Sequence, residues 1–169
     1  FSVRLTTEML GDLWQDSQKS VGHARAAGKY VFRRDKRENS VIVLDRMFWP
    51  WAWKQVFSDM PGVYVHAVRM DQFLRAPSTH TITRKWVDGG RLREQDHEAI
   101  AKGAIVTFGA ELVEPEPDDV VATEPQSTPT VEQITTALTR MGSAIGVSPF
   151  GRKFGYGRFI PESVGTVSA

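Results

Sequence analysis

Cysteine is absent from this sequence, so disulfides, thiolate metal sites and cysteine nucleophiles are excluded. Long apolar runs are absent too, and none approaches the roughly 20 residues that span a bilayer, so we expect no membrane span. An excess of one charge is also lacking, because 21 Lys and Arg stand against 20 Asp and Glu and give a net charge of +1. That balance excludes a strongly basic, histone-like chain and an acidic disordered tail.

Recognisable catalytic and metal-binding motifs are also missing. No P-loop and no Gly-x-Ser-x-Gly elbow occurs. Glu94 and Asp96 are close in sequence, but nothing makes them an acid–base pair. The histidines lack the spacing of metal ligands, and they are His23, His66, His80 and His97. We therefore expect a protein that is not an enzyme and that uses no cofactor, no metal and no small-molecule substrate.

What the 169 residues do contain is enough apolar material, 41% of the chain, for one ordinary domain or two very small ones. In residues 1–62, apolar spacing predicts a helix over 6–28, and two short apolar runs around a charged turn predict a hairpin over 30–46. Pro50 suits the first turn of a helix within 47–60. The dense aromatic side chains of that helix favour core packing over base stacking. The cations of the charged turn fit either phosphate contacts or a solvated loop.

The C-terminal part of the sequence changes character. Residues 114–130 are acidic and rich in proline, which predicts a linker or an extended arm. A helix is expected over 131–144, with Thr130 as its cap. In 148–159, glycines separate aromatic from cationic residues, namely Phe150, Arg152, Lys153, Phe154, Tyr156 and Arg158. Two interpretations stay open for this segment: it threads through RNA or protein surfaces, with the aromatic rings stacking, or it lies strapped over its own domain.

The stretch from 68 to 113 carries a family resemblance in its order of short motifs. These are Arg69-Met70-Asp71 before Phe73-Leu74, Thr79 before Arg84-Lys85-Trp86-Val87, Gly90-Arg91-Leu92, and Lys102-Gly103 before a strand from Ile105 to Leu112. The stretch resembles the RNA-binding domain named after small-subunit ribosomal protein four, here called the S-four domain. The version found at the front of RNA pseudouridine synthases is the most similar.

The resemblance implies two helices followed by a β-hairpin, and it implies RNA binding. The first helix would contain Arg69 to Leu74, and the second would start at Thr79 and carry Arg84 and Lys85. Two departures are that Arg93-Glu94-Gln95 replaces the usual Val-Asn-Gly and that Ala104 replaces an acidic residue. The catalytic Arg-Leu-Asp segment of a pseudouridine synthase does not follow this stretch, which agrees with a non-catalytic protein.

Local charge agrees with a phosphate-binding surface. Cations outnumber Asp71, Asp88 and Glu94 between residues 69 and 94, although nearby carboxylates could hold part of the cluster in surface ion pairs. The residues that we predict to contact RNA are Arg69, Arg75, Arg84, Lys85, Arg91 and Arg93, followed by Arg152, Lys153 and Arg158.

The sequence thus predicts an α+β protein of four parts: a helix, hairpin and aromatic unit (1–62), an S-four-like domain (63–113), a linker (114–130), and a C-terminal helix with a basic tail (131–169). We expect an RNA-binding, structural component of a ribonucleoprotein, a mitochondrial ribosome above all, with rRNA and neighbouring proteins as partners. The start at Phe1 rather than Met indicates either a processed end, left by an organelle presequence or by a tag cut, or a sequence that begins internally. One alternative is a structural subunit of a respiratory complex or a virion, and the other is a fragment of an RNA-modifying enzyme.

Overall fold

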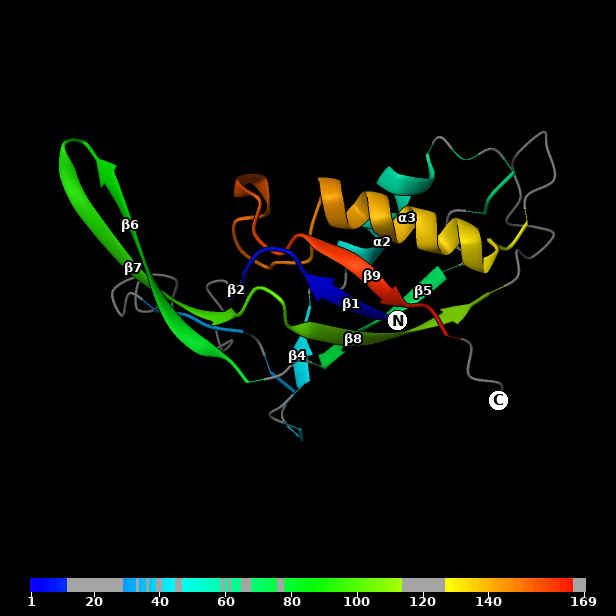
Figure 1. Cartoon of the computed structure of the whole chain (residues 1–169), viewed down its shortest axis with the longest axis horizontal. Helices are drawn as coiled ribbons and strands as arrows, with labels where there is room; N and C mark the ends of the chain where they lie inside the picture. Colours follow the sequence, from blue (N-terminus) through cyan, green and yellow to red (C-terminus); the bar gives the residue numbers. More distant parts are fainter. Residues whose placement is uncertain are drawn as a thin grey trace.

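Two β-sheets and two α-helices make up the part of the chain that the structure describes (Figure 1). The structure is a computed structural model, and it describes residues 1–11, 29–32, 34–35, 37–38, 41–44, 47–58, 60, 62–64, 68–75, 78–113 and 127–165. In chain order the elements are β1 (Ser2–Leu5), β2 (Met9–Leu10), β3 (Lys29–Tyr30), β4 (Val41–Val43), α2 (Phe48–Phe57), β5 (Val68–Arg75), β6 (His80–Asp88), β7 (Arg91–Ile100), β8 (Ile105–Leu112), α3 (Val131–Ala144), the 3-10 helix η2 (Arg152–Phe154) and β9 (Phe159–Ser163).

The larger sheet has the strand order β4-β5-β8-β1-β9, and neighbouring strands in it run antiparallel. Strand β1 lies between β8 and β9, so residues near the two ends of the chain pair side by side. The smaller sheet has the order β2-β7-β3, and β6 pairs with β7 in addition. Strand β3 runs parallel to β7. This mixed architecture confirms the α+β class.

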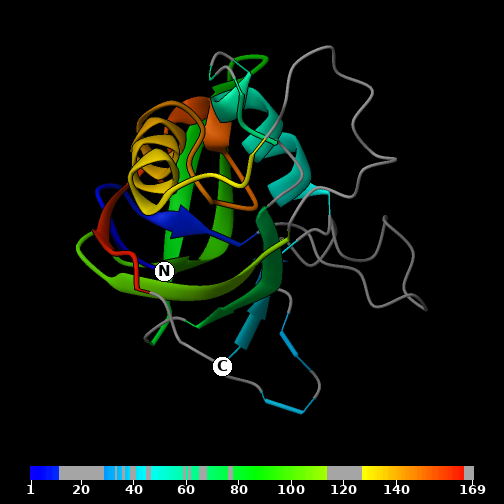
Figure 2. The same cartoon turned by 90° about the vertical axis from the view of Figure 1, so that its right-hand side faces the viewer.

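Helices α2 and α3 pack next to each other on one face of the larger sheet (Figure 2). In α2 the core positions are 48, 49, 52, 53, 56 and 57, which is the spacing of one helical face. Trp49 and Trp53 are almost fully buried there, so core packing of the aromatic segment is confirmed. Trp51 lies on the other face of the helix and is 47% exposed.

Helix α3 begins at a capping box. The Thr130 hydroxyl accepts from the Gln133 N–H, and the Gln133 side chain accepts from the Thr130 N–H. Its buried stripe packs towards α2 and β9, and it ends where Gly146 adopts a left-handed conformation and donates to the Met141 carbonyl. The predicted helix over 131–144 and its Thr130 cap are both confirmed.

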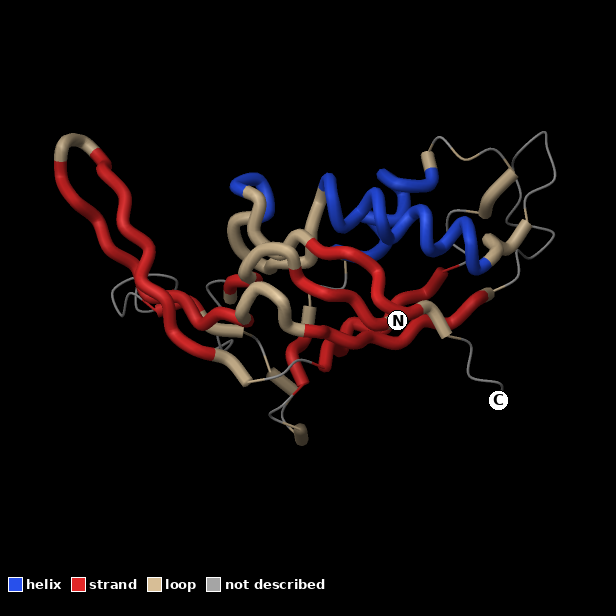
Figure 3. The backbone as a smooth tube through the Cα atoms, in the orientation of Figure 1, coloured by secondary structure: helices blue, strands red, loops and turns tan. Residues whose placement is uncertain are grey.

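The strands β6 and β7 form a long two-stranded ribbon that stands away from the rest of the molecule (Figure 3). Gly89 and Gly90 form its two-residue turn, and both have positive φ angles, of 56° and 76°. A tight turn of this kind requires positive φ at both central positions, and glycine supplies it without strain. The pairing is continuous from His80 opposite Ala99 to Asp88 opposite Arg91.

The two helices that the S-four resemblance implies are wrong. Residues 68–75 and 80–88 are strands β5 and β6, so the S-four arrangement of two helices and a hairpin is not what this stretch forms. The physical reason lies in 79–87, where Thr, Ile, Trp and Val favour a pleated strand and lead directly into the Gly-Gly turn. The predicted turn at Lys102-Gly103 and the strand Ile105–Leu112 are confirmed.

The structure confirms some of the predictions for the N-terminal part of the chain and contradicts others. The helix predicted within 47–60 is confirmed and spans Phe48–Phe57, with Pro50 in its first turn. The helix over 6–28 is wrong at its start, because residues 9–10 pair with β7, and the remainder from residue 12 lies outside the described residues. The hairpin over 30–46 is confirmed only in part: Arg34 forms an antiparallel bridge with Ile42, but β3 pairs with β7 and β4 pairs with β5. The linker residues 114–126 also lie outside the described part.

A close approach between α3 and β9 predicts an unusual response to mutation at Gly142. A Cβ added there would lie 2.1 Å from the Phe159 carbonyl oxygen. In an exposed helix, Gly→Ala raises stability by about 1 kcal/mol. We expect Gly142→Ala instead to lower the free energy of unfolding, by about 1–3 kcal/mol, because the packed backbone must shift.

Urea denaturation measures this change, and Thr136→Ala on the exposed face of the same helix is the matched control. A Gly142→Ala variant that is as stable as the wild type would contradict the close packing of α3 on β9.

Candidate nucleic-acid interface

The pairing of the ribbon decides which of its charges share a face. Residues directly opposite each other in an antiparallel pair point to the same side, and successive residues alternate. One side therefore carries Arg84 opposite Gln95, Trp86 opposite Arg93 and Asp88 opposite Arg91. We call this side the arginine face, and its residues are Arg84, Trp86, Asp88, Arg91, Arg93 and Gln95. Three arginines against one aspartate give it a net charge of +2.

The other side of the ribbon has the opposite charge. It carries Lys85 together with Glu94, Asp96 and Glu98, which gives a net charge of −2, and we call it the carboxylate face. Lys85 Nζ lies 2.8 Å from the Glu94 carboxylate. This hydrogen bond, and then the charge of Glu94, raise the pKa of Lys85 above its ordinary value. Lys85 is therefore in an ion pair and turned away from the three arginines.

The remaining cations predicted from the same stretch lie in the other sheet. Arg69 and Arg75 are on β5, where Arg69 stands opposite Glu111 on β8. The Arg75 guanidinium lies 3.6 Å from the Glu38 carboxylate. The six predicted contacts thus do not form one patch, and Arg84, Arg91 and Arg93 are the three that the structure brings together.

Arg84 is held by the C-terminal part of the chain. Its guanidinium carbon lies 5.2 Å from the ring centre of Phe150, 5.7 Å from that of Phe154 and 5.3 Å from that of Tyr156. We call these three rings the aromatic cage. Each distance is within the range of a cation–π interaction. Arg84 therefore attaches the ribbon to the segment around η2.

The segment around η2 packs tightly on its own domain. The Ser148 hydroxyl accepts from the Leu10 N–H at 2.8 Å, and the Gly157 N–H donates to the Glu8 carbonyl at 2.7 Å. Gly157 has φ 72°, and a Cβ there would meet the Ser148 backbone nitrogen at 2.3 Å. Of the two interpretations of residues 148–159, the strap over the domain is the one that the structure shows.

Arg152 connects the same segment to α2. Its guanidinium carbon lies 4.6 Å from the ring centre of Phe48 and 5.6 Å from that of Trp51. Lys153 Nζ lies 5.0 Å from the ring centre of Phe154. Arg158 donates its backbone N–H to Thr7 Oγ1, and the buried Nη1 of its guanidinium has no hydrogen-bond partner among the described residues.

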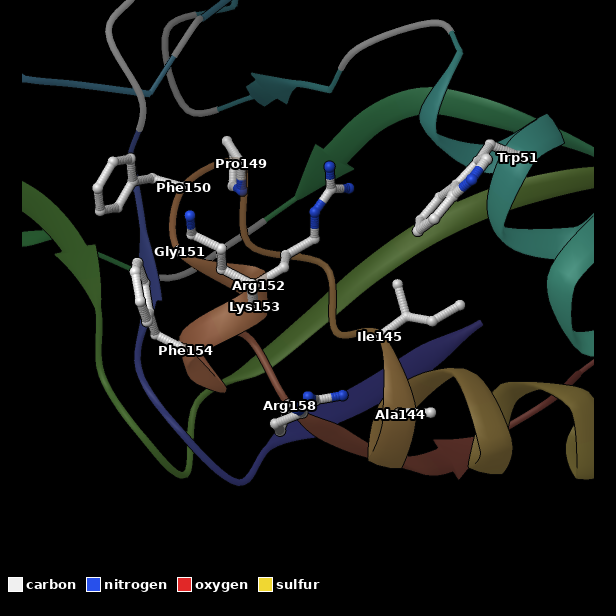
Figure 4. A pocket seen from close by; sticks show the side chains of 10 residues that line it. All are labelled: Trp51, Ala144, Ile145, Pro149, Phe150, Gly151, Arg152, Lys153, Phe154 and Arg158. Carbon is white, nitrogen blue, oxygen red and sulfur yellow. The ribbon is translucent and has the colours of Figure 1, made fainter.

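An open groove of about 730 Å³ lies between this segment and the two helices (Figure 4). A second groove of about 480 Å³ adjoins it, and both are bordered by Trp51, Ala144 and Ile145. We call the two together the basic groove. Its charged and aromatic lining residues are Trp51, Arg140, Phe150, Arg152, Lys153, Phe154 and Arg158. Among the described residues that line it, none is acidic.

The arginine face and the basic groove are neighbours. In Figure 1 the ribbon and the two helices rise on the same side of the molecule, and η2 lies between them. Phe150 and Phe154 belong both to the aromatic cage around Arg84 and to the lining of the groove. One continuous surface therefore offers arginines, exposed aromatic rings and a groove whose lining, as far as it is described, contains no carboxylate.

Sequence reasoning missed Trp51, Trp86 and Arg140 as parts of this surface. A signal for Trp51 was present, because the spacing of the buried positions in 48–57 places residue 51 outside the apolar face. Trp86 would have followed from an alternating strand pattern with a Gly-Gly turn. Arg140 becomes part of the surface because α3 packs beside α2, and no local sequence pattern indicates this packing.

The carboxylate face has its own role at the base of the ribbon. Glu98 accepts from Thr79 Oγ1 at 2.6 Å and from the Phe32 N–H at 2.9 Å, and it forms an ion pair with Arg34. His97 is fully buried on the other side of β7, where its ring centre lies 4.6 Å from those of Tyr30 and Phe150. These contacts hold the ribbon base in the smaller sheet.

The aromatic cage leads to a prediction for stability. We expect Arg84→Ala to lower the free energy of unfolding by about 1–2 kcal/mol, because it removes a partly desolvated cation from three rings. Arg91→Ala, on the same face but exposed beside the turn, is the matched control and should change it by less than about 0.5 kcal/mol.

Urea denaturation of both variants measures the difference. Equal destabilisation by the two substitutions would mean that the cage does not hold the ribbon.

Within the described ranges, no group of three or more His, Asp or Glu side chains is placed to hold a metal ion. No described helix has the length and apolar character that crossing a membrane requires. No protein-family model matches the chain, and no curated protein has significant similarity to it.

Proposed function

We propose that this chain is a non-catalytic, RNA-binding component of a ribonucleoprotein. The observation that carries the proposal is the arginine face, where three arginines and a tryptophan share one side of a projecting ribbon in a nearly neutral chain. Guanidinium groups match phosphate oxygens in geometry and keep their charge at any physiological pH. Structured RNA, whose shape and backbone are read more than its base edges, is the partner class that such a face suits.

The shape of the ribbon also supports this proposal. Its nine paired residues in β6 span about 30 Å at ~3.3 Å per residue, which is long enough to follow several phosphates. Asp88 lies 3.8 Å from Arg93 and offsets part of the charge. The carboxylate face would repel an RNA backbone, so RNA has one side of the ribbon available to it.

In this proposal the chain is one component of a larger ribonucleoprotein particle. A ribosome is one such assembly, with rRNA and neighbouring proteins as partners, and the mitochondrial ribosome stays a prediction from the sequence. Arg69 and Arg75, in the other sheet, are not needed for the arginine face to bind.

Protein contact is the second candidate function, and one observation favours it. Val87 is 72% exposed and Leu92 is 63% exposed, and the two are cross-strand neighbours beside the turn. An exposed apolar pair at the end of a projecting ribbon suits a contact with another protein. The chain would then be a structural subunit of a protein assembly such as a respiratory complex or a virion.

A salt series with a fluorescently labelled RNA hairpin tests RNA binding. We expect the wild-type affinity to fall steeply with salt, because bound phosphates release counterions. The double variant Arg91→Ala/Arg93→Ala should bind more weakly and lower the salt slope by about 2, one unit for each lost phosphate contact. Lys85→Ala removes a cation of the same ribbon from its other face and should leave both quantities unchanged.

Two results would count against the proposal. If Lys85→Ala reduced affinity as much as the double variant, the arginine face would not be the binding surface. If the wild type bound RNA no better than a neutral control protein, protein contact would replace RNA binding as the function.

A further inference from the structure

Two aromatic side chains that line the basic groove, Trp51 and Phe154, are exposed to solvent and not packed into the core. Trp51 is 47% exposed although its neighbours in α2 are buried, and Phe154 is 61% exposed at the end of η2. Neither belongs to the apolar core. Figure 4 shows them on opposite sides of the groove, with the Arg152 side chain between them. Arg152 lies over Trp51, and Arg84 and Lys153 lie over Phe154, so the exposed part of each ring that these cations do not cover is available to a ligand with flat, unsaturated groups.

The positive charge around these rings favours the binding of an anion. Arg140, Arg152, Lys153 and Arg158 line the basic groove, and none of its described lining residues is acidic. The C-terminal end of α3 lies at the groove and contributes about half a negative charge, which four cations exceed. A ligand that combines flat rings with negative charge at intervals meets both requirements, and a nucleic-acid strand is such a ligand.

The shape of the groove favours a strand over a single nucleotide. The two grooves meet at Trp51, Ala144 and Ile145, so the binding surface continues from η2 past the end of α3 rather than closing around one ligand. Phe154 and Phe150 connect its other end to Arg84 and so to the arginine face. A strand that leaves the groove there reaches the ribbon.

We infer that the basic groove binds unstacked bases of single-stranded RNA, an inference that rests on the proposed RNA-binding function. One base stacks on the exposed face of Trp51 and another on Phe154. Lys153 and Arg158 contact the phosphates near η2, and Arg140 contacts those beyond Trp51. Arg152 already lies over Phe48 and Trp51, so it positions the Trp51 ring and adds its charge. The ribbon, by contrast, contacts backbone phosphates and does not require unpaired bases.

Single-stranded RNA is favoured over a duplex because stacking on a side chain needs a free base face. In a duplex, the neighbouring base pairs cover these faces, whereas loops and single strands expose them to aromatic rings. The groove and the ribbon therefore differ in the form of RNA that they bind, and this difference makes the two sites separable by experiment.

The experiment compares a single-stranded oligonucleotide with a blunt RNA duplex of the same length. Binding of each to the full chain is measured by fluorescence anisotropy for the wild type, Trp51→Ala and Phe154→Ala. Ile160→Ala, an apolar residue of β9 that is about half exposed and lies outside the groove, is the matched control. We expect each aromatic substitution to weaken single-strand binding about 10-fold. Trp51→Ala should leave duplex binding within about 2-fold, whereas Phe154→Ala, which also removes a ring of the aromatic cage around Arg84, should weaken duplex binding by a smaller factor than single-strand binding. Ile160→Ala should change neither.

Photocrosslinking adds a readout that folding defects would not imitate. A single strand that contains 4-thiouridine, irradiated on the wild-type protein, should crosslink to peptides that contain Trp51 or Phe154. Crosslinks confined to the ribbon would overturn the inference.

The outcomes separate this inference from the proposed function. If the wild type binds both RNA forms and the aromatic variants lose neither preferentially, the groove inference is wrong and the ribbon function stands. If the wild type binds neither form, the proposed function itself is wrong. Equal affinity for single-stranded DNA of the same base sequence would overturn the assignment to RNA.

Discussion

The enclosure of the Arg84 guanidinium by Phe150, Phe154 and Tyr156 is the contact on which the arrangement of the candidate surface depends. A two-stranded ribbon by itself is marginally stable in water. Here its base is paired into the smaller sheet, and Arg84 attaches the part above the base to the segment that precedes β9. That segment is fixed in turn by the pairing of β9 with β1. The cage therefore places the arginine face beside the basic groove.

Successive residues of each strand point to opposite sides of the ribbon, so its positive and negative charges are separated although the overall composition is nearly neutral. Its cations and carboxylates cancel overall, but Arg84, Arg91 and Arg93 point to one side and Lys85 with most of the carboxylates points to the other. The sequence predicts a local excess of cations and, as the alternative, ion pairs that hold part of the cluster, but it does not specify which cations share a face. Their separation follows from the strand register, which depends on the Gly89-Gly90 turn. A helical interpretation of 79–87 could not give it.

The parts of the fold that were predictable carry strong local signals. Helix α3 has a capping box and a clear apolar stripe, and α2 has a dense aromatic face. The motif resemblance predicts helices where β5 and β6 form, whereas the β-branched and aromatic residues of 79–87 favour a strand. The pairing of β1 with β8 and β9 joins residues more than 90 positions apart, and no local pattern specifies such contacts. The basic groove depends on the same long-range packing.

An NMR titration of the 18.9 kDa chain with RNA tests the central claim, that the arginine face and the basic groove act as one surface. The account predicts that amide shift changes on adding a short single strand cover both the ribbon around Arg84 and Arg93 and the groove around Trp51 and Phe154, at the same RNA concentrations. Shift changes confined to the ribbon tip at Val87 and Leu92, or absent from both regions, would contradict it.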